Sequence, residues 1–262
     1  YKWTRVPMGL TGAPSYFQRV MTDEVLTGLV HHICEVYLDD IIIFGRNMEE
    51  FLKNLRAVLE RLIEYNITLN PDKCRIGLEE IEYVGHVINK ERITFSREKL
   101  QKVIEVPLPK TAKHLRSFVG LANYFREHVR NHSARIEPLI RLLDDYNPRR
   151  LIDWDVAPEA LEAFKDIQQA INECPQLFFM EEGESEVHLY TDASILGVGA
   201  YLCQRRPNGK EYPIGFFSKS LNKTEKAWGI PELEGYAIYA AFKHFDYLLR
   251  DAHTHVHTDH RN

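Results

Sequence analysis

Two adjacent aspartates interrupt an otherwise apolar run, and this interruption constrains the fold more than any other feature of the sequence. The run from Ile33 to Phe44 is rich in β-branched and aromatic residues, yet Asp39 and Asp40 stand at its centre. Two carboxylates are costly inside a buried strand pair unless a cation neutralises them. The pattern therefore predicts a β-hairpin whose tight turn carries both acids. Hard oxygen ligands at such a turn suit Mg²⁺, and a solvent-exposed Asp-Asp turn is the alternative.

Helices are predicted on both sides of this hairpin. Before it, two turn signals precede apolar residues at helical spacing from Phe17 to Leu26. After it, a helix is predicted from Met48 to Tyr65, because Asn47 and Glu50 form a capping-box-like start and an apolar stripe follows. The segment from Ile81 to Ile88 is typical of a strand or of one arm of a hairpin.

The charge of the chain is distributed unevenly, although its sum is only −5. From Arg97 to Arg150 there are 12 Lys or Arg against 6 Asp or Glu, which gives +6; from Leu151 to Tyr190 there is 1 Lys against 10 acids, which gives −9. The negative sum argues against a nucleic-acid partner, but the basic segment favours one. Two solvated faces are the alternative. Both segments are predicted to be partly helical, with Thr111 as a cap in the first and an amphipathic stretch from Trp154 to Cys174 in the second.

A different architecture is predicted to begin near Val187. Its elements are a strand from Val187 to Asp192, a strand from Ala200 to Gln204, a strand from Tyr212 to Ser218, a helix from Pro231 to Leu249, and a strand from His253 to Asp259. A glycine-rich bend at Gly197 and Gly199 is predicted between the first two strands.

Three acids occupy corresponding ends of these elements. Asp192 ends the first strand, Glu234 lies on the helix, and Asp259 ends the last strand. Acids placed in this way can converge on a two-metal site that hydrolyses a phosphodiester. Glu232 competes with Glu234 for the position on the helix, about 200° around its axis.

Composition excludes several classes of protein. The apolar stretches are far shorter than the roughly 18 residues that span a bilayer, and the four cysteines are too widely spaced for a zinc knuckle. No signal segment follows Tyr1, and an intracellular compartment is expected. Because the sequence does not begin with Met and stops at Asn262 without a terminal helix, we expect a fragment of a longer polypeptide. Alternating His253, His255 and His257 predict a partly exposed strand, with a zinc site as the alternative.

Four motifs follow one another along the chain. They are Val6 to Arg19 (VPMGLTGAPSYFQR), Val36 to Asp40 (VYLDD), Tyr83 to Ile88 (YVGHVI) and Leu115 to Arg126 (LRSFVGLANYFR). In this order they make the chain resemble, over essentially its whole length, the reverse transcriptase and RNase H part of the Pol polyprotein of Gypsy-type (Metaviridae) long-terminal-repeat retrotransposons. The third motif is similar to the primer-grip hairpin of that family, and the fourth is similar to its thumb.

The resemblance implies an α+β fold in four parts. Residues 1–93 correspond to a palm with partial fingers, 94–150 to a basic helical thumb, 151–186 to an acidic tether, and 187–262 to an RNase H-like α/β domain that is truncated at its C-terminus. By the same resemblance, one palm aspartate lies upstream of Tyr1 and one RNase H acid lies beyond Asn262. The fragment alone is therefore expected to polymerise poorly and to be weak as a nuclease.

The resemblance also implies roles for individual residues in polymerisation. Asp39 and Asp40 correspond to palm carboxylates that hold Mg²⁺, with Mn²⁺ as a possible substitute. Met8 and Gly9 border the incoming nucleotide, and Gln18 lies on the helix behind the templating pair.

Further roles follow for the primer grip and the nuclease. Val84, Gly85 and His86 correspond to the primer grip. Asp192, Glu234 and Asp259 correspond to metal-holding acids of RNase H, and Glu234 is preferred to Glu232 because Glu-Gly-Tyr-Ala-Ile matches the spacing of the family.

The implied function is RNA-directed DNA synthesis coupled to degradation of the RNA strand. The implied partners are an RNA template, a DNA primer, the RNA–DNA hybrid, deoxynucleoside triphosphates, and the protease and integrase of a Pol polyprotein, with no membrane. The implied location is a cytoplasmic virus-like particle. Three alternatives remain: a catalytically inactive or domesticated remnant that binds nucleic acid or a partner, an RNase H-like connection domain without activity, and a nuclease whose palm serves as a scaffold.

Overall fold

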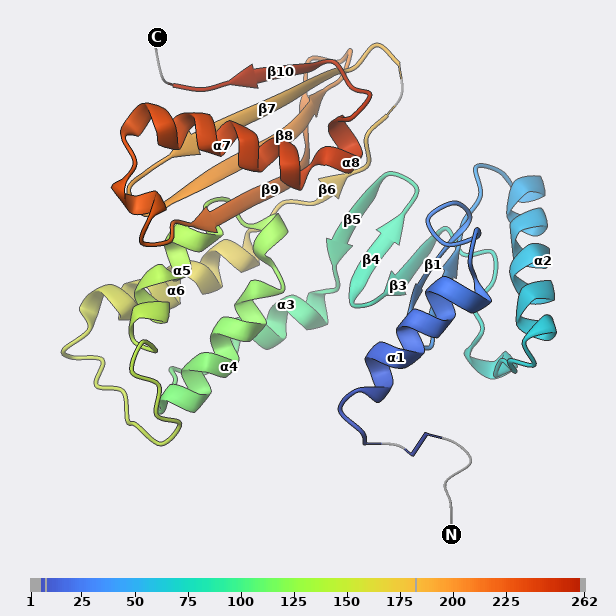
Figure 1. The fold of residues 1–262 in the computed structure, drawn as a ribbon, viewed down its shortest axis with the longest axis horizontal. Helices are drawn as coiled ribbons and strands as arrows, with labels where there is room; N and C mark the ends of the chain where they lie inside the picture. The colour runs from blue at the N-terminus through green and yellow to red at the C-terminus, as the bar shows by residue number, and fades with distance from the viewer. Residues whose placement is uncertain (1–5, 8, 182, 260–262) are drawn as a thin grey trace. The chain divides into compact units, whose positions relative to one another are not determined.

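The aspartate-bearing run forms the predicted hairpin in the structure, a computed structural model that describes residues 6–7, 9–181 and 183–259. The chain divides into two units, Tyr1–Val84 and Gly85–Asn262, and each unit is described by itself. Figure 1 shows the order of the helices and strands within them.

The first unit combines the hairpin with helices. Its elements are α1 (Ala13–Val20), a π-helical turn (Met21–Val25), β1 (Cys34–Tyr37), β2 (Asp40–Ile43), α2 (Met48–Glu64), a 3₁₀ turn (Pro71–Lys73) and β3 (Glu80–Tyr83). Apolar side chains from these segments meet in one core, whose buried members are Met21, Val25, Leu26, Val30, Cys34, Val36, Val58 and Leu62. The core fixes the hairpin against the helices.

The hairpin turn has an unusual backbone. Strands β1 and β2 pair antiparallel with Tyr37 opposite Asp40, so that Leu38 and Asp39 form the turn between them. Leu38 adopts a positive φ of 54°. This left-handed conformation costs a residue with a side chain roughly 1–2 kcal/mol. Other contacts must therefore hold the turn in place.

Helix α2 confirms the predicted helix of this region. The Asn47 side chain accepts a hydrogen bond from the Glu50 amide at 2.9 Å, and the Glu50 carboxylate accepts one from the Arg46 amide at 2.8 Å. The helix ends at Glu64, one residue before the predicted end. The polar residues at its start satisfy backbone groups that a helix leaves free at its N-terminus.

The second unit begins with strands and a helical layer. These elements are β4 (His86–Asn89), β5 (Arg92–Phe95), α3 (Arg97–Ile104), α4 (Ala112–Asn123), a 3₁₀ turn (Arg126–His128), α5 (His132–Arg141), α6 (Pro158–Asn172) and β6 (Leu177–Phe178). Buried residues of α4, α5 and α6 share one core, which includes Leu115, Phe118, Ile136, Leu139, Phe164, Ile167 and Ile171. The segment predicted as an acidic tether therefore contains a helix that is packed with the basic helices.

Two local predictions in this region need correction or refinement. The predicted strand or hairpin arm at residues 81–88 is two strands, because Val84 and Gly85 both adopt positive φ, 48° and 78°, between β3 and β4. The predicted helix from Trp154 begins later, at Pro158, a residue suited to a first helical turn. Trp154 itself lies in the preceding loop, where its indole donates a hydrogen bond to the Pro109 carbonyl at 2.8 Å. Thr111 caps α4 as predicted, by accepting a hydrogen bond from the His114 amide.

The remainder of the second unit is a four-stranded sheet with a helix across it. The elements are β7 (Glu186–Ala193), β8 (Gly197–Arg205), β9 (Glu211–Ser220), a 3₁₀ turn (Glu225–Ala227), α7 (Ile230–His244), α8 (Asp246–Leu249) and β10 (Thr254–His257). The strand order is β10-β7-β8-β9, with β10 parallel to β7 and the other pairs antiparallel. Figure 1 shows α7 lying across this sheet, and buried residues of the helix and the strands share a core.

Two predictions for this sheet are wrong. Gly197 and Gly199 do not form a bend but lie within β8, because the strand approaches its neighbour closely: a Cβ at Gly197 would lie 2.6 Å from the Lys219 carbonyl oxygen. The predicted single helix from Pro231 to Leu249 is divided into α7 and α8. The division falls at Phe245, whose ring is buried and packs closely against Gly215. A Cβ at residue 215 would lie only 3.1 Å from that ring.

Hydrogen bonds join the helical layer to the sheet within this unit. The Arg126 guanidinium donates to the Ser218 carbonyl at 3.1 Å. The Ser133 amide donates to the Ser218 hydroxyl at 3.0 Å, and the two serine hydroxyls are also 3.0 Å apart. The start of α5 is therefore seated directly on β9.

Candidate functional site

The aspartate turn of the first unit is held by a side chain from α1. The Gln18 carbonyl oxygen accepts a hydrogen bond from the Leu38 amide at 2.6 Å, and its amide nitrogen donates to the Val36 carbonyl at 2.9 Å. The same nitrogen lies 3.1 Å from the Thr22 hydroxyl, which in turn donates to the Gln18 backbone carbonyl. Gln18 thus bridges the turn from both ends of its amide. The sequence pointed to Gln18 as a residue behind the templating pair but did not reveal this bridge.

The carboxylates at the turn are exposed and create a local negative charge. Asp39 lies in the turn and Asp40 opens β2, and both are exposed to solvent. Burial, together with the negative charges of Glu35 and Asp40, raises the pKa of Tyr83 to about 12. The tyrosine therefore stays protonated at neutral pH beside the acids. A cation at the turn would relieve their repulsion.

The other predicted residues of the polymerase site lie around turns. Gly9 adopts a φ of 92°, which a residue with a Cβ rarely adopts, and Met8 lies outside the described residues. Val84 and Gly85 form the positive-φ turn described above, and His86 opens β4. The structure gives these residues a defined backbone, and their roles in binding remain predictions.

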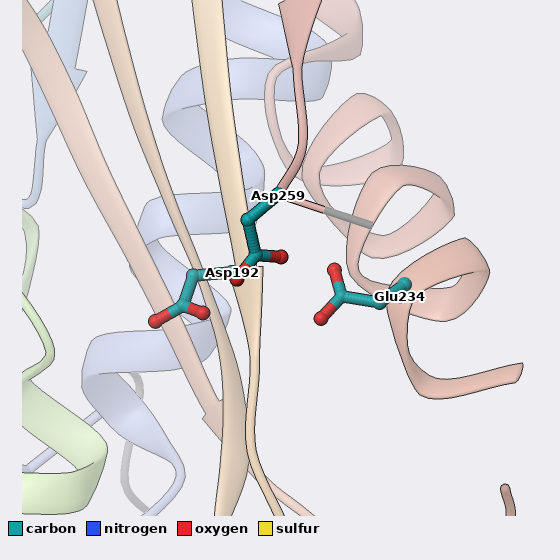
Figure 2. Close-up of side chains that lie close together, drawn as sticks. All are labelled: Asp192, Glu234 and Asp259. Carbon is teal, nitrogen blue, oxygen red and sulfur yellow. The ribbon is translucent and has the colours of Figure 1, made fainter. Parts of the chain in front are cut away.

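Three acids of the second unit come together, as Figure 2 shows. One carboxylate oxygen from each of Asp192, Glu234 and Asp259 can be chosen so that all three lie within 4.8 Å of one another. Glu234 is buried, with 6% of its surface exposed, whereas the two aspartates are exposed. The three residues are the spatial cluster that their places at the ends of separate elements predicted.

The sheet register explains why the two aspartates are neighbours. Parallel strands β7 and β10 pair Tyr190 with His257. Asp192, still within β7, and Asp259, just past the end of β10, each lie two residues beyond this pair, so the register brings them close together. Thr258, the residue before Asp259, donates its hydroxyl to the Glu234 carboxylate at 3.3 Å. Sequence reasoning did not identify this contact.

The two glutamates at the start of α7 make different contacts. The Glu232 carboxylate accepts a hydrogen bond from the Gly229 amide at 2.7 Å and thereby caps the start of the helix. Glu234, two residues later, faces the sheet and the aspartates. The geometry therefore favours Glu234 as the member of the cluster, in agreement with the choice made from the sequence.

The chemistry of this donor set suits a hard divalent cation. Three carboxylates this close repel one another unless a cation lies between them. Oxygen-only donors are typical of Mg²⁺ and Mn²⁺ sites rather than of zinc sites. Within the described part of the chain, this is the one group of at least three His, Cys, Asp or Glu side chains positioned to share an ion. The histidines on β10 do lie on an edge strand, as predicted, but they form no such group.

Comparison with known proteins gives two family matches and long sequence relatives. Residues 1–88 match the family described as reverse transcriptase (RNA-dependent DNA polymerase), and residues 156–256 match the RNase H-like domain found in reverse transcriptase. The Pol polyprotein of transposon 297 from Drosophila melanogaster is 34% identical over 261 residues, which cover 100% of this chain and 24% of that protein. Residues 1–88 therefore belong to the reverse transcriptase family, and residues 156–256 belong to the family of RNase H-like domains found in reverse transcriptases.

Two other relatives of the chain are also transposon polyproteins. The Pol polyprotein of transposon opus from Drosophila melanogaster is 31% identical over 268 residues, and the Tf2-3 transposon polyprotein of Schizosaccharomyces pombe is 29% identical over 264. Both alignments cover 100% of the chain, and they cover 26% and 19% of those proteins. The chain thus spans about a quarter or less of the length of these curated relatives.

Solved structures confirm the fold class of the chain. The foamy viral protease-reverse transcriptase in complex with RNA/DNA hybrid matches 97% of this chain and 33% of its own, with a TM-score of 0.73 and 25% identity. A form of that enzyme in complex with double-stranded DNA matches with the same TM-score and covers 43% of its own chain. The predicted α+β fold, a reverse transcriptase followed by an RNase H-like domain, is therefore confirmed.

Two further findings concern metal dependence and membrane-spanning helices. Reverse transcriptase and RNase H-like domains depend on divalent metals, which agrees with the acid cluster. Among the described residues, no helix is long and apolar enough to cross a lipid bilayer.

Proposed function

We propose that this chain forms part of an enzyme that copies RNA into DNA and degrades the RNA strand of the resulting hybrid. The observation that carries the proposal is the convergence of Asp192, Glu234 and Asp259 in the RNase H-like region of a chain whose other part is a reverse transcriptase. Random drift in a purely structural domain has no reason to keep three mutually repelling carboxylates together. This feature disfavours the inactive remnant.

In the polymerase part, the exposed turn presents the metal-holding acids. Asp39 and Asp40 would hold Mg²⁺, with Mn²⁺ as a substitute, and Gln18 fixes the turn that carries them. Met8 and Gly9 border the incoming nucleotide, and Val84, Gly85 and His86 grip the primer. The positioning of the turn by α1 supports this assignment because an acid that holds a metal must be kept within a fraction of an ångström of its working position.

In the nuclease part, the acids come from three different elements. Asp192 lies in β7, Asp259 follows the adjacent parallel strand β10, and Glu234 approaches from α7. Thr258 donates to the Glu234 carboxylate and thereby restricts its orientation. When bound, divalent cations at the two sites would neutralise developing charge on the transferred phosphoryl group and activate the attacking hydroxyl or water.

The partners follow from the chemistry of the proposed reactions. They are an RNA template, a DNA primer, the RNA–DNA hybrid and deoxynucleoside triphosphates, and the basic segment from Arg97 to Arg150 supplies charge for the phosphate backbones. A protease and an integrase in the same polyprotein, and reverse transcription in a cytoplasmic virus-like particle, complete the proposal. The similar foamy viral structures contain DNA and RNA/DNA hybrid, which supports the nucleic-acid partners.

Two matched variants of the full-length protein test the proposal. Asp39→Asn is expected to abolish nucleotide incorporation on an RNA template while hybrid cleavage continues. Asp192→Asn is expected to abolish cleavage while incorporation continues. A nuclease with a scaffold palm would lose no activity through Asp39→Asn, and an inactive remnant would show neither activity in the unmodified protein.

A further inference from the structure

The ammonium group of Lys99, on α3, is held in a fixed place beside Gly85. A Cβ on Gly85 would lie 1.5 Å from Lys99 Nζ and 2.8 Å from the Tyr124 hydroxyl oxygen. The space that a side chain at residue 85 would fill is therefore filled by the lysine. Glycine is required at this turn for its positive φ of 78° and also for this close approach.

The ring of Tyr124 fixes the ammonium from the other side. Lys99 Nζ lies 4.6 Å from the centre of the Tyr124 ring, a cation–π distance, and donates to its hydroxyl at 3.4 Å. The lysine is half-buried, unlike the exposed Lys102 one turn later. A lysine side chain normally loses considerable rotamer freedom when it binds an anion, and this one has already lost most of it.

No carboxylate among the described residues pairs with the ammonium of Lys99. Among the described residues, no carboxylate lies within 4.0 Å of its ammonium, whereas Lys102 on the same helix pairs with Glu98 at 2.7 Å. The nearby His86 adds no second positive charge, because burial and the positive charge of Lys99 both lower its pKa and keep the imidazole neutral at pH 7. A fixed cation without a counter-charge is the local arrangement that suits an external anion.

We propose that Lys99 binds a backbone phosphate of the nucleic acid on which the enzyme acts, with Gly85 and Tyr124 as the residues that position its ammonium. This inference rests on the proposed function, because it supplies one contact for the nucleic acid that the reverse transcriptase would bind. Lys99 belongs to the segment from Arg97 to Arg150, where basic residues outnumber acids by 12 to 6. Its preordered ammonium distinguishes it from the paired lysine on the same helix.

The salt dependence of binding tests the inference in the full-length protein. The probe is a fluorescently labelled duplex of an RNA template and a DNA primer, titrated at a series of KCl concentrations with anisotropy as the readout. Each neutralised phosphate contributes about 0.9 to the slope of log K against log salt. Lys99→Gln is expected to weaken binding several-fold and to make this slope less negative by about 0.9. Gly85→Ala, which displaces the ammonium, is expected to produce the same change.

Lys102→Gln is the matched control, because it removes one positive charge from the same helix. We expect the salt slope of this variant to equal that of the unmodified protein, and Lys99→Arg is expected to retain the slope through its charge. If Lys99→Gln unfolds the protein, Lys99→Met keeps the contact with the Tyr124 ring and replaces it in the test. A folded Lys99 variant whose slope equals that of the Lys102 control overturns the inference. If the unmodified protein does not bind the duplex at all, the proposed function itself fails.

Discussion

Replacing Gln18 by alanine removes the two hydrogen bonds that hold the aspartate turn. The Leu38 amide loses its acceptor and the Val36 carbonyl loses its donor. A hydrogen bond contributes about 0.5–1.5 kcal/mol net, so the pair holds the turn by about 1–3 kcal/mol. Because 1.36 kcal/mol corresponds to a factor of ten, the ordered turn becomes about 5- to 160-fold less populated relative to other conformations.

The backbone of the turn makes this loss consequential. Leu38 occupies the left-handed region at a cost of roughly 1–2 kcal/mol, which is similar in size to the contribution of Gln18. Without the glutamine, the turn is free to relax and to carry Asp39 away from its place. We therefore expect Gln18→Ala to slow single-turnover nucleotide incorporation by the full-length protein by about 5- to 160-fold. Cleavage of an RNA–DNA hybrid by the same protein is expected to be unchanged, because the nuclease acids lie in the other unit.

Two further variants at this position separate the turn contacts from general stability. Gln18→Glu keeps an acceptor for the Leu38 amide but cannot donate to the Val36 carbonyl, so an intermediate rate is expected. Thr22→Val removes only the contact between Thr22 and the glutamine, and a rate close to that of the unmodified protein is expected. The reasoning is refuted if folded Gln18→Ala incorporates nucleotide at the unmodified rate, or if it loses incorporation and cleavage equally.

Three other predictions concern the second unit. Glu232→Ala removes the carboxylate that caps α7 and should lower the free energy of unfolding by about 0.5–2 kcal/mol, measured by denaturant titration. Hybrid cleavage should persist in this variant. Loss of cleavage in the folded variant would count against Glu234 as the acid of the site. Gly197→Ala forces a Cβ to 2.6 Å from the Lys219 carbonyl oxygen and should destabilise the protein by about 1–3 kcal/mol in the same assay, and an unchanged stability would contradict the close strand approach. Burial lowers the pKa of His128 from 6.5 to about 3. As the pH falls, the unfolded chain therefore binds a proton at this histidine before the folded protein does. The contribution of the neutral imidazole to the free energy of unfolding is complete above pH 6.5 and declines towards pH 3. As the pH is lowered from 7 to 4, the free energy of unfolding should therefore fall less steeply in His128→Phe than in the unmodified protein. An identical dependence on pH in the two proteins would show that this histidine is not buried in its neutral form.

Local signals in the sequence were sufficient for elements whose ends are fixed by their own residues. Asn47 and Thr111 cap the helices that were predicted to begin after them, because a cap satisfies backbone groups within three residues of itself. The aspartate hairpin follows for a similar reason, since an apolar run can reverse direction only where its polar residues lie. The clustering of Asp192, Glu234 and Asp259 was also predictable, because each lies on or next to an element whose place in the chain order fixes its position in the sheet.

Features that depend on distant contacts were not predictable in the same way. Gly197 and Gly199 indicated a bend when considered alone, but both lie in β8 and pair with β9, and at Gly197 the backbone of β9 approaches too closely for a side chain. The role of Gln18 depends on a turn 20 residues further along the chain, and nothing in its own helix identifies that partner. Likewise, Lys99 is distinguished from its helical neighbours only by the glycine and tyrosine that surround its ammonium.

In the acidic segment from Leu151 to Tyr190, net charge and apolar packing indicate different structures. Its net charge of −9 agreed with the acidic tether predicted for residues 151–186, yet Phe164, Ile167 and Ile171 on α6 are buried in the core of the basic helices. Burial of such side chains stabilises by about 1.5–3 kcal/mol each, whereas exposed ion pairs contribute at most about 1 kcal/mol. The apolar stripe therefore determines where α6 lies, and the acids follow on its outer face. One of them, Asp166, pairs with Arg135 on α5 at 2.5 Å. This ion pair adds to a contact between the two helices that is formed mainly by apolar side chains.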